Sequence, residues 1–181
     1  SDLVNIKDNE KLTLTFRDNK SYEFDYLVAA DGVFSKTKEI LFKNDGLPKY
    51  FNSIALRGNI RNFVNADISL YLGPNFHYVI YPINQNKDFN FISIIRKELI
   101  KSEISNKNLF TDKTFTNNLI NQISSKTKLN LEEIVKEIKC FPIFVSKKIQ
   151  IPKIKKIFLT GDAFYSFSPS FAQGASQSIE S

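Results

Sequence analysis

The amino-acid sequence predicts an α/β fold in which a partial parallel-sheet domain is interrupted by an antiparallel β-sheet domain with helices on one side. Residues 26–30 and 157–160 are apolar runs typical of buried strands, and they lie far apart in the chain. Each run ends at an acidic residue beside a glycine, in Asp31-Gly32 and Gly161-Asp162. The segment between them repeats strand after strand with short turns, which is typical of an antiparallel sheet. We therefore expect one domain with another inserted into it.

Residues 1–47 are expected to form the first part of the interrupted domain. Alternating apolar and polar side chains predict an antiparallel meander at residues 3–7, 11–17 and 21–25. The strand that follows, 26–30, is apolar on both faces, which predicts a covering layer on either side. A short helix is expected over 35–42 with Ser35 as its N-cap.

Residues 48–152 are expected to form the inserted domain. Its strands are predicted at 50–61, 68–72, 76–83 and 89–96, with turns at 73–75 and 84–87. The apolar side chains of 114–125 recur at the spacing of one helical stripe, and a second short helix is predicted over 131–137. A strand at 138–145 follows. The chain is expected to return to the first domain over 153–181.

Composition excludes several classes of protein. Hydrophobic residues make up 42% of the chain and charged residues 24%, as in ordinary globular domains. No apolar run approaches the roughly 20 residues that cross a bilayer, so we expect no transmembrane segment. The net charge is +6, but the lysines are scattered, so we expect no nucleic-acid partner. No signal peptide is visible and a cytoplasmic location is expected; the sequence carries no signal for an oligomeric state.

The chain has one cysteine and one histidine. Cys140 therefore has no intrachain disulfide partner, and its apolar neighbours predict a half-buried strand residue rather than a nucleophile. A lone histidine makes a zinc site improbable, so no metal is expected.

The C-terminal segment has the pattern of a nucleotide-cofactor site. A strand, an acidic residue, a loop and a glycine that opens a helix suit a cofactor with a ribose or ribityl chain and a pyrophosphate. A carboxylate such as Asp162 can accept hydrogen bonds from ligand hydroxyls, or it can be a helix cap or turn residue. Residues 173–176 are expected to open a helix whose free amides carry partial positive charge; an ordinary helix start has the same residues.

Four motifs in the same order resemble the single-component flavoprotein aromatic hydroxylases. Asp31-Gly32-Val33-Phe34-Ser35 resembles their DG motif. Their GD motif is matched by Gly161-Asp162-Ala163, Pro169 and Ala172-Gln173-Gly174-Ala175-Ser176. Between them, 56–58 and 72–83 are similar to the salicylate-hydroxylase-like branch. The resemblance covers most of the chain.

The resemblance implies a fold, cofactors and a reaction. It implies that 1–47 and 153–181 are parts of a Rossmann-like FAD/NAD(P)-binding domain and that 48–152 is the substrate domain. The implied enzyme is an FAD-dependent, NAD(P)H-consuming monooxygenase that hydroxylates an aromatic or conjugated acid with dioxygen, through a flavin C4a-hydroperoxide. Dehydrogenases, reductases and halogenases share this fold, and an inactive remnant without bound flavin is the further alternative.

The resemblance also assigns residues to the cofactor. The implied cofactor-binding residues are Asp31, Gly32, Ser35, Gly161, Asp162, Pro169, Gln173, Gly174, Ala175 and Ser176. Asp162 corresponds to the residue that binds the ribityl chain of FAD, and 173–176 to the helix start beside the pyrimidine edge of the flavin. Pro169 corresponds to the proline beside the flavin ring; it can equally serve to stiffen the loop. For Asp31-Gly32, a tight turn that closes strand to helix predicts the same residues.

Candidate substrate-side catalytic residues follow from strand periodicity. Ser53, Ala55, Arg57 and Asn59 are expected on one face of their strand, and His77, Val79 and Tyr81 share a face of theirs. Arg57 can clamp a carboxylate in bidentate fashion, or it can simply lie on a solvated face. A neutral imidazole at His77 can polarise or deprotonate a phenol, although a lone histidine on a strand is often structural.

The sequence also departs from the family. No glycine forms the Gly-x-Gly-x-x-Gly turn with which the family begins, and the chain starts at Ser1 and contains no methionine. We therefore expect an internal piece of a longer enzyme, inactive by itself. Phe164, Tyr165 and Ser181 stand where the family has alanine, histidine and an acidic residue. The bulky Phe164, Tyr165 and Phe167 predict a narrowed pocket on the flavin side.

Overall fold

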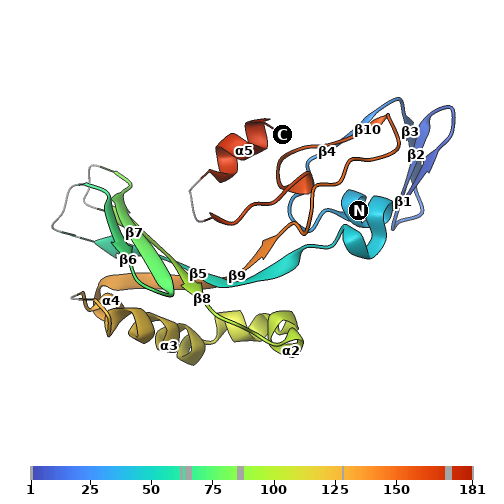
Figure 1. The fold of residues 1–181 in the computed structure, drawn as a ribbon. Coiled ribbons are helices and arrows are strands. Elements are labelled where there is room, and N and C mark those ends of the chain that lie inside the picture. The colour runs from blue at the N-terminus through green and yellow to red at the C-terminus, as the bar shows by residue number, and fades with distance from the viewer. Residues whose placement is uncertain are drawn as a thin grey trace. The chain divides into compact units, whose positions relative to one another are not determined.

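The computed structural model describes residues 2–61, 63, 67–84, 88–127, 129–169 and 173–180. The chain divides into two compact units (Figure 1). One unit, here called the split unit, comprises Ser1–Lys49 and Phe144–Ser181. The other, called the inserted unit, comprises Tyr50–Ile143.

The split unit begins with the predicted antiparallel meander. Its strands are β1 (Leu3–Asp8), β2 (Leu12–Phe16) and β3 (Ser21–Phe24), in the order β1-β2-β3. Leu12 and Leu14 of the central strand are buried, whereas the threonines between and beside them are partly exposed. This alternation is the one that the sequence predicted.

The two acid-tipped strands pair in parallel in one sheet. They are β4 (Leu27–Ala29) and β10 (Ile157–Leu159), with Val28 opposite Phe158. The Thr160 amide extends the pairing by donating to the Ala29 carbonyl at 3.0 Å. The expectation that these distant segments meet is confirmed, and the chain leaves both strands at the same edge of the sheet.

The expectation that β4 is covered on both faces is wrong for the described residues. Ile157 and Leu159 are buried, but on the opposite face Val28 is 66% exposed and Phe158 is 52% exposed. Tyr26, whose ring lies 6.3 Å from that of Phe158, is also exposed. The apolar composition of both faces therefore leaves one face without a covering layer in the part of the chain described here.

Each strand of this small sheet is followed in the chain by a helix, β4 by α1 (Lys36–Phe42) and β10 by α5 (Gly174–Glu180). α1 starts where predicted, because the Ser35 hydroxyl caps it by accepting a hydrogen bond from the Lys38 amide. A short 3₁₀ turn, η1 (Lys43–Asp45), follows α1. A second 3₁₀ turn, η3 (Gly161–Ala163), follows β10, and α5 begins at the predicted glycine.

The inserted unit is built on a five-stranded sheet. Its strands are β5 (Lys49–Arg61), β6 (Ser69–Leu72), β7 (Phe76–Pro82), β8 (Asp88–Arg96) and β9 (Val135–Val145), in the order β6-β7-β8-β5-β9. The pairs β6 with β7, β7 with β8, and β5 with β8 are antiparallel, as predicted. Residues 85–87 of the predicted turn at 84–87 lie outside the described residues.

The helices of the inserted unit are α2 (Lys101–Ser105), α3 (Lys113–Ser124) and α4 (Leu131–Ile134), with the 3₁₀ turn η2 (Lys107–Thr111) after α2. They lie on one side of the sheet (Figure 1). α3 starts where the Asp112 carboxylate accepts a hydrogen bond from the Phe115 amide at 2.7 Å. The sequence analysis did not predict α2 or η2.

The predicted second helix, 131–137, is too long. It ends at Ile134, and residues 135–137 belong to β9. β9 pairs with β5, and a Cβ at Gly58 would lie 2.6 Å from the Val135 side chain. The close pairing of β9 with β5 overrides the local preference of residues 135–137 for a helix. The absence of a side chain at Gly58 permits this pairing.

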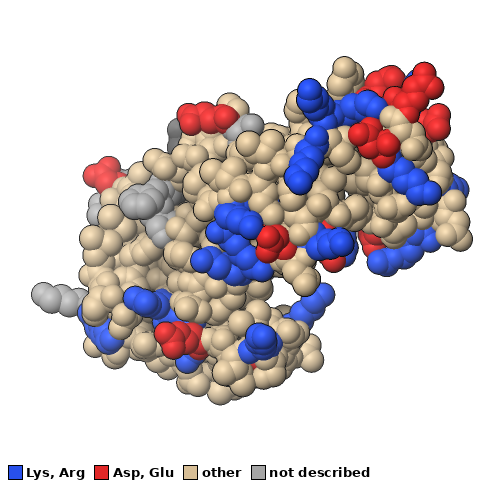
Figure 2. Space-filling model, turned by 45° about the vertical axis from the view of Figure 1, so that its right-hand side comes forward, with Lys and Arg blue, Asp and Glu red and all other residues tan. Residues whose placement is uncertain are grey.

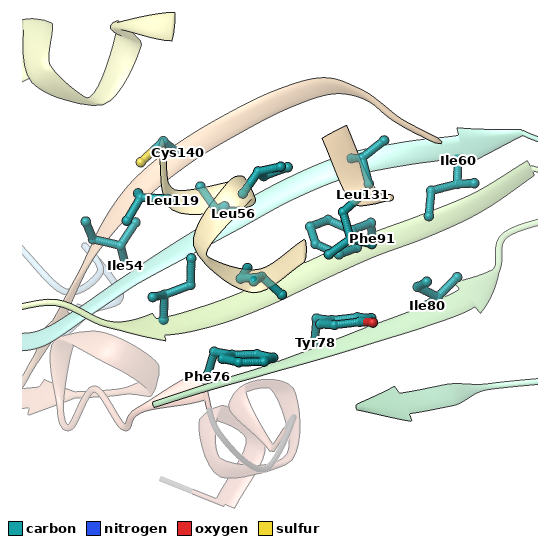
Figure 3. Close-up of a cluster of buried hydrophobic side chains, with 14 of the residues drawn as sticks. Ile54, Leu56, Ile60, Phe76, Tyr78, Ile80, Phe91, Leu119, Leu131 and Cys140 are labelled. Atoms are coloured by element: carbon teal, nitrogen blue, oxygen red, sulfur yellow. The ribbon is translucent and has the colours of Figure 1, made fainter. Parts of the chain in front are cut away.

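The core of the inserted unit lies between the sheet and its helices. Figure 3 shows side chains of β5, β7 and β8 meeting those of α3 and α4, including Leu56, Tyr78, Phe91, Leu119 and Leu131. Cys140 of β9 is buried here too, and burial raises the pKa of its thiol to about 12. A protonated, enclosed thiol has a packing role, as the sequence indicated, but Cys140 is buried and not half-buried as predicted.

The predicted fold class is confirmed: the chain is α/β, with parallel strands in the split unit and an antiparallel sheet with helices on one side in the inserted unit. None of the helices among the described residues is both long and apolar enough to cross a membrane. On the face shown in Figure 2, Lys and Arg side chains form separate groups. Some of this charge is paired locally, as in Lys156 with Asp8 at 2.9 Å.

Candidate cofactor site and substrate face

The turn after β4 is tied to the start of α1. One oxygen of the Asp31 carboxylate accepts a hydrogen bond from the Thr37 amide at 3.0 Å. Partial burial favours a higher pKa for this carboxyl, but hydrogen bonds from Ser35 and Thr37 outweigh it and lower the pKa below its usual value. Gly32 has a φ of 78°, and its carbonyl accepts from the Ser35 amide at 3.1 Å. Asp31 therefore holds the first turn of α1.

The turn after β10 leaves its carboxylate free. Gly161 has a φ of 58°, and its carbonyl accepts hydrogen bonds from the Phe164 and Tyr165 amides at 2.9 and 3.0 Å. Asp162 is exposed, and within the part of the chain that the structure describes its carboxylate has no hydrogen bond or ion pair. This carboxylate is available for a ligand, whereas that of Asp31 is already engaged.

α5 lies beside the turn after β10. A Cβ at Gly161 would be 3.5 Å from the Ser178 side chain, which is ordinary van der Waals contact. Gln173 precedes the helix, and its carbonyl accepts hydrogen bonds from the Gln177 amide and the Ser176 hydroxyl. Among the described residues, nothing lies within 4 Å of the position that a Cβ would take at Gly174.

Other residues of the predicted motif are placed as follows. Pro169 is exposed, and Ala175 is in the first turn of α5. Ala172 and Ser181 lie outside the described residues. The rings of Tyr165 and Phe167 pack edge to face, with centroids 4.6 Å apart, beyond the Asp162 turn.

The predicted substrate-side residues share one face of the inserted sheet. The strand register places Ala55, Ile94 and His77 in one row, Arg57, Ile92 and Val79 in the next, and Asn59, Asn90 and Tyr81 in a third. The core residues alternate with these rows on the opposite face. Arg57, His77 and Tyr81 are thus brought to the same surface of the sheet, here called the substrate face.

The substrate face combines polar groups with an apolar floor. Arg57 is exposed, and partial burial lowers the pKa of His77, so its imidazole favours the neutral form. The Asn90 side-chain amide donates to the Tyr81 hydroxyl, and Asn90 is only 4% exposed. Ile92, Ile94 and Val79 lie between these polar groups.

Sequence reasoning missed functional candidates in both units. Asn90 was passed over, although an asparagine within the apolar strand 89–96 is a visible signal, because a buried polar group needs a partner. Lys38 was treated only as a helix residue, yet it is buried and reaches the Asp162 turn. No pattern in the sequence distinguishes Lys38 from its exposed neighbour Lys36.

Comparisons with known proteins show what this chain is similar to. No protein-family model matches the sequence. An FAD-dependent monooxygenase from Aspergillus terreus (strain NIH 2624 / FGSC A1156) is 25% identical over an alignment that covers 95% of this chain and 43% of the relative. The FAD-dependent monooxygenase pigN of Monascus ruber is 25% identical over 49% of this chain and 23% of the relative. The chain thus spans less than half the length of these curated relatives.

Solved structures share the fold. A salicylate hydroxylase in a substrate complex has a TM-score of 0.74 at 20% identity, covering 99% of this chain and 49% of that one. The 2,6-dihydroxypyridine-3-hydroxylase from Arthrobacter nicotinovorans has a TM-score of 0.72 at 18% identity, covering 98% of this chain and 52% of that one. The resemblance to FAD-dependent monooxygenases, expected from four short motifs, is confirmed by sequence similarity to the curated relatives. The fold is the one that these solved hydroxylases have.

Proposed function

We propose that this chain is a portion of an FAD-dependent monooxygenase that consumes NAD(P)H and dioxygen and hydroxylates an aromatic or conjugated acid. The observation that carries the proposal is the pairing of β4 with β10, which brings Gly32 and the free carboxylate of Asp162 to one sheet edge. The similarity to FAD-dependent monooxygenases supports it. In this proposal the split unit binds the cofactor and the inserted unit binds the substrate.

The residues of the split unit fit the flavin nucleotide. Asp162 is exposed and has no hydrogen-bond partner among the described residues, as binding of ribityl hydroxyls requires. Positive φ at Gly32 and Gly161 turns the chain sharply at the end of each strand. At Gly32 and Gly174 none of the described residues lies within 4 Å of the position that a Cβ would take, which supports room for a ligand. Gly161, Pro169, Gln173, Ala175 and Ser176 complete the proposed cofactor segment. Ser35 and Asp31 support it by holding α1.

When bound and reduced by NAD(P)H, the flavin supplies the activation of dioxygen, and the protein binds and orients. We propose that Arg57 on the substrate face pairs with the carboxylate of the acid, because a guanidinium binds a carboxylate through two parallel hydrogen bonds. His77 is held toward its neutral form and can accept a proton from a phenolic hydroxyl. Tyr81, fixed by Asn90, offers a hydroxyl of defined orientation.

Oxygen-dependent product formation tests this proposal. The full-length protein that contains this chain is purified and incubated with FAD, NADH or NADPH, and a panel of aromatic acids, with and without oxygen. The proposal expects a bound flavin absorbance spectrum and a product that is one oxygen atom heavier, formed only with oxygen and a nicotinamide nucleotide. Product without oxygen would identify a dehydrogenase or reductase, and a halide-dependent product would identify a halogenase. A colourless protein that binds no FAD would indicate a remnant without flavin.

A further inference from the structure

Lys38 of α1 is a buried cation. It is 3% exposed, and its ammonium group donates to the Ser146 hydroxyl at 3.1 Å and to the Phe164 carbonyl at 2.9 Å. Among the residues that the structure describes, no carboxylate pairs with it. Burial lowers the pKa of its amine, as expected for an ammonium group held by neutral acceptors.

An unpaired buried charge is costly, so its position needs an explanation. Moving an ammonium group out of water costs several kcal/mol even in a relaxed protein interior, and two neutral acceptors offset only part of this cost. An apolar side chain would fill the same space without the penalty. What lysine offers here, and an apolar side chain does not, is several hydrogen-bond donors at the end of a long side chain.

The partners of Lys38 show what it connects. The Ser146 hydroxyl also accepts from the Ser166 amide at 3.0 Å, and the Ser146 amide donates to the Ser166 carbonyl at 3.0 Å. Phe164 directly follows the 3₁₀ turn that contains Asp162. The side chain of Lys38 thus reaches the segment after β9 and the end of the Asp162 turn at once.

The backbone of Lys38 is fixed from the other side. Its amide donates to the Ser35 hydroxyl at 2.9 Å, and the amide of the preceding Thr37 donates to Asp31 at 3.0 Å. The residue therefore belongs to the first turn of α1, which the Asp31 turn holds. Through one side chain, the turn after β4 is connected to the turn after β10.

We propose that Lys38 is a positioning residue that fastens the Asp162 turn to the start of α1 and so fixes the Asp162 carboxylate for the flavin ribityl chain. The role in flavin binding rests on the function proposed above. The attachment of the Asp162 turn to α1 by Lys38 does not depend on that function, because it can be measured in the protein without a ligand.

The test compares Lys38→Met and Lys38→Arg with the matched control Lys36→Met in the purified full-length protein that contains this chain. Lys36 lies two positions away in α1 and is exposed, with an ion pair to Glu39. Two readouts are used, amide hydrogen exchange over 161–166 and the Kd for FAD. Lys38→Met is expected to speed exchange at least tenfold and to raise the Kd at least tenfold. Lys38→Arg keeps the charge and donors and is expected to restore most of both, and Lys36→Met is expected to change neither more than twofold.

Unchanged exchange over 161–166 in folded Lys38→Met would overturn the proposal. If Lys38→Met is too unstable to purify, Ser146→Ala replaces it, and exchange is read only at the Phe164 and Tyr165 amides, because the Ser166 amide itself donates to the Ser146 hydroxyl. Ser146→Ala removes one acceptor of the Lys38 ammonium group. Faster exchange at these two amides supports the fastening, and wild-type exchange refutes it. Faster exchange in a protein that binds no FAD even as wild type would uphold the fastening and refute the proposed function. Faster exchange with an unchanged Kd would refute the role of Lys38 in flavin binding.

Discussion

The turns at Asp31 and Asp162 look alike in sequence but use their carboxylates differently. Each follows a strand of the same parallel pair, each contains a glycine with positive φ, and each acid is exposed. Asp31 accepts a hydrogen bond from the Thr37 amide and holds α1, whereas Asp162 has no partner among the described residues. A strand-acid-glycine signature thus locates a sheet edge, but the hydrogen-bond partner decides whether the acid serves the fold or a ligand.

The largest expected effect comes from the free acid. Asp162→Ala is expected to weaken FAD binding by about 10–100-fold, because a hydrogen bond to a charged acceptor contributes about 1.5–3 kcal/mol. The free energy of unfolding without FAD is expected to stay within about 0.5 kcal/mol of wild type, as for exposed side chains without partners. Flavin fluorescence titration and chemical denaturation measure the two quantities. A variant that binds FAD like wild type would remove Asp162 from the site.

Gly161, beside Asp162, is expected to matter for the stability of its turn, because its backbone has a positive φ. Gly161→Ala is expected to lower the free energy of unfolding by about 1–2 kcal/mol, because a φ of 58° is unfavourable for a residue with a Cβ. The space itself is not the obstacle, since the nearest atom to that Cβ would be 3.5 Å away. Gly174→Ala is the matched control, because Gly174 begins α5 in open space and alanine is the better helix former. Equal losses in both variants would contradict a backbone cause.

Asp31, whose carboxylate is hydrogen-bonded, is expected to contribute to the free energy of unfolding, whereas Asp162 is not. Asp31→Ala removes an acceptor at the start of α1 and should cost about 1 kcal/mol, the usual loss of a helix cap. The pKa of Asp31 is lowered in the folded state, so its contribution is fully present above the unfolded pKa of about 3.9 and is lost as the pH falls through the folded pKa. Denaturation at pH 7 and at acidic pH should therefore show a difference from wild type that shrinks in acid. A constant difference would mean that the ionised carboxylate is not what stabilises α1.

Sequence patterns predicted what depends on local chemistry. The meander, the Ser35 cap and the shared face of Arg57 and Asn59 follow from period-two alternation and from capping preferences, which act within a few residues. The pairing of β4 with β10 was inferred from two like signatures, and the structure confirms it. That Arg57 and His77 share a surface could not be predicted, because it depends on the register between β5, β8 and β7.

The features that the sequence analysis predicted wrongly or did not predict have the same physical cause in both units. The helix at 131–137 was predicted too long because pairing of β9 with β5 overrides a local helical pattern. The exposed face at Val28 and Phe158 was expected to be covered because composition reports what a strand can bury rather than what lies beside it. The burial of Lys38 was invisible for the same reason. Contacts between segments that are distant in sequence decide all three.

On the substrate face, the smallest expected effect is a change at His77 in how the free energy of unfolding depends on pH. Partial burial lowers the pKa of His77, so the folded state binds fewer protons than the unfolded state just below an unfolded pKa of about 6.5. His77 therefore adds no pH dependence above that value, and as the pH falls through the folded pKa the protein loses stability. His77→Gln should flatten this part of the profile when the free energy of unfolding is measured between pH 7.5 and pH 5. Parallel profiles for the variant and wild type would show that burial on this face does not hold the imidazole neutral, and would remove the basis for His77 as a proton acceptor.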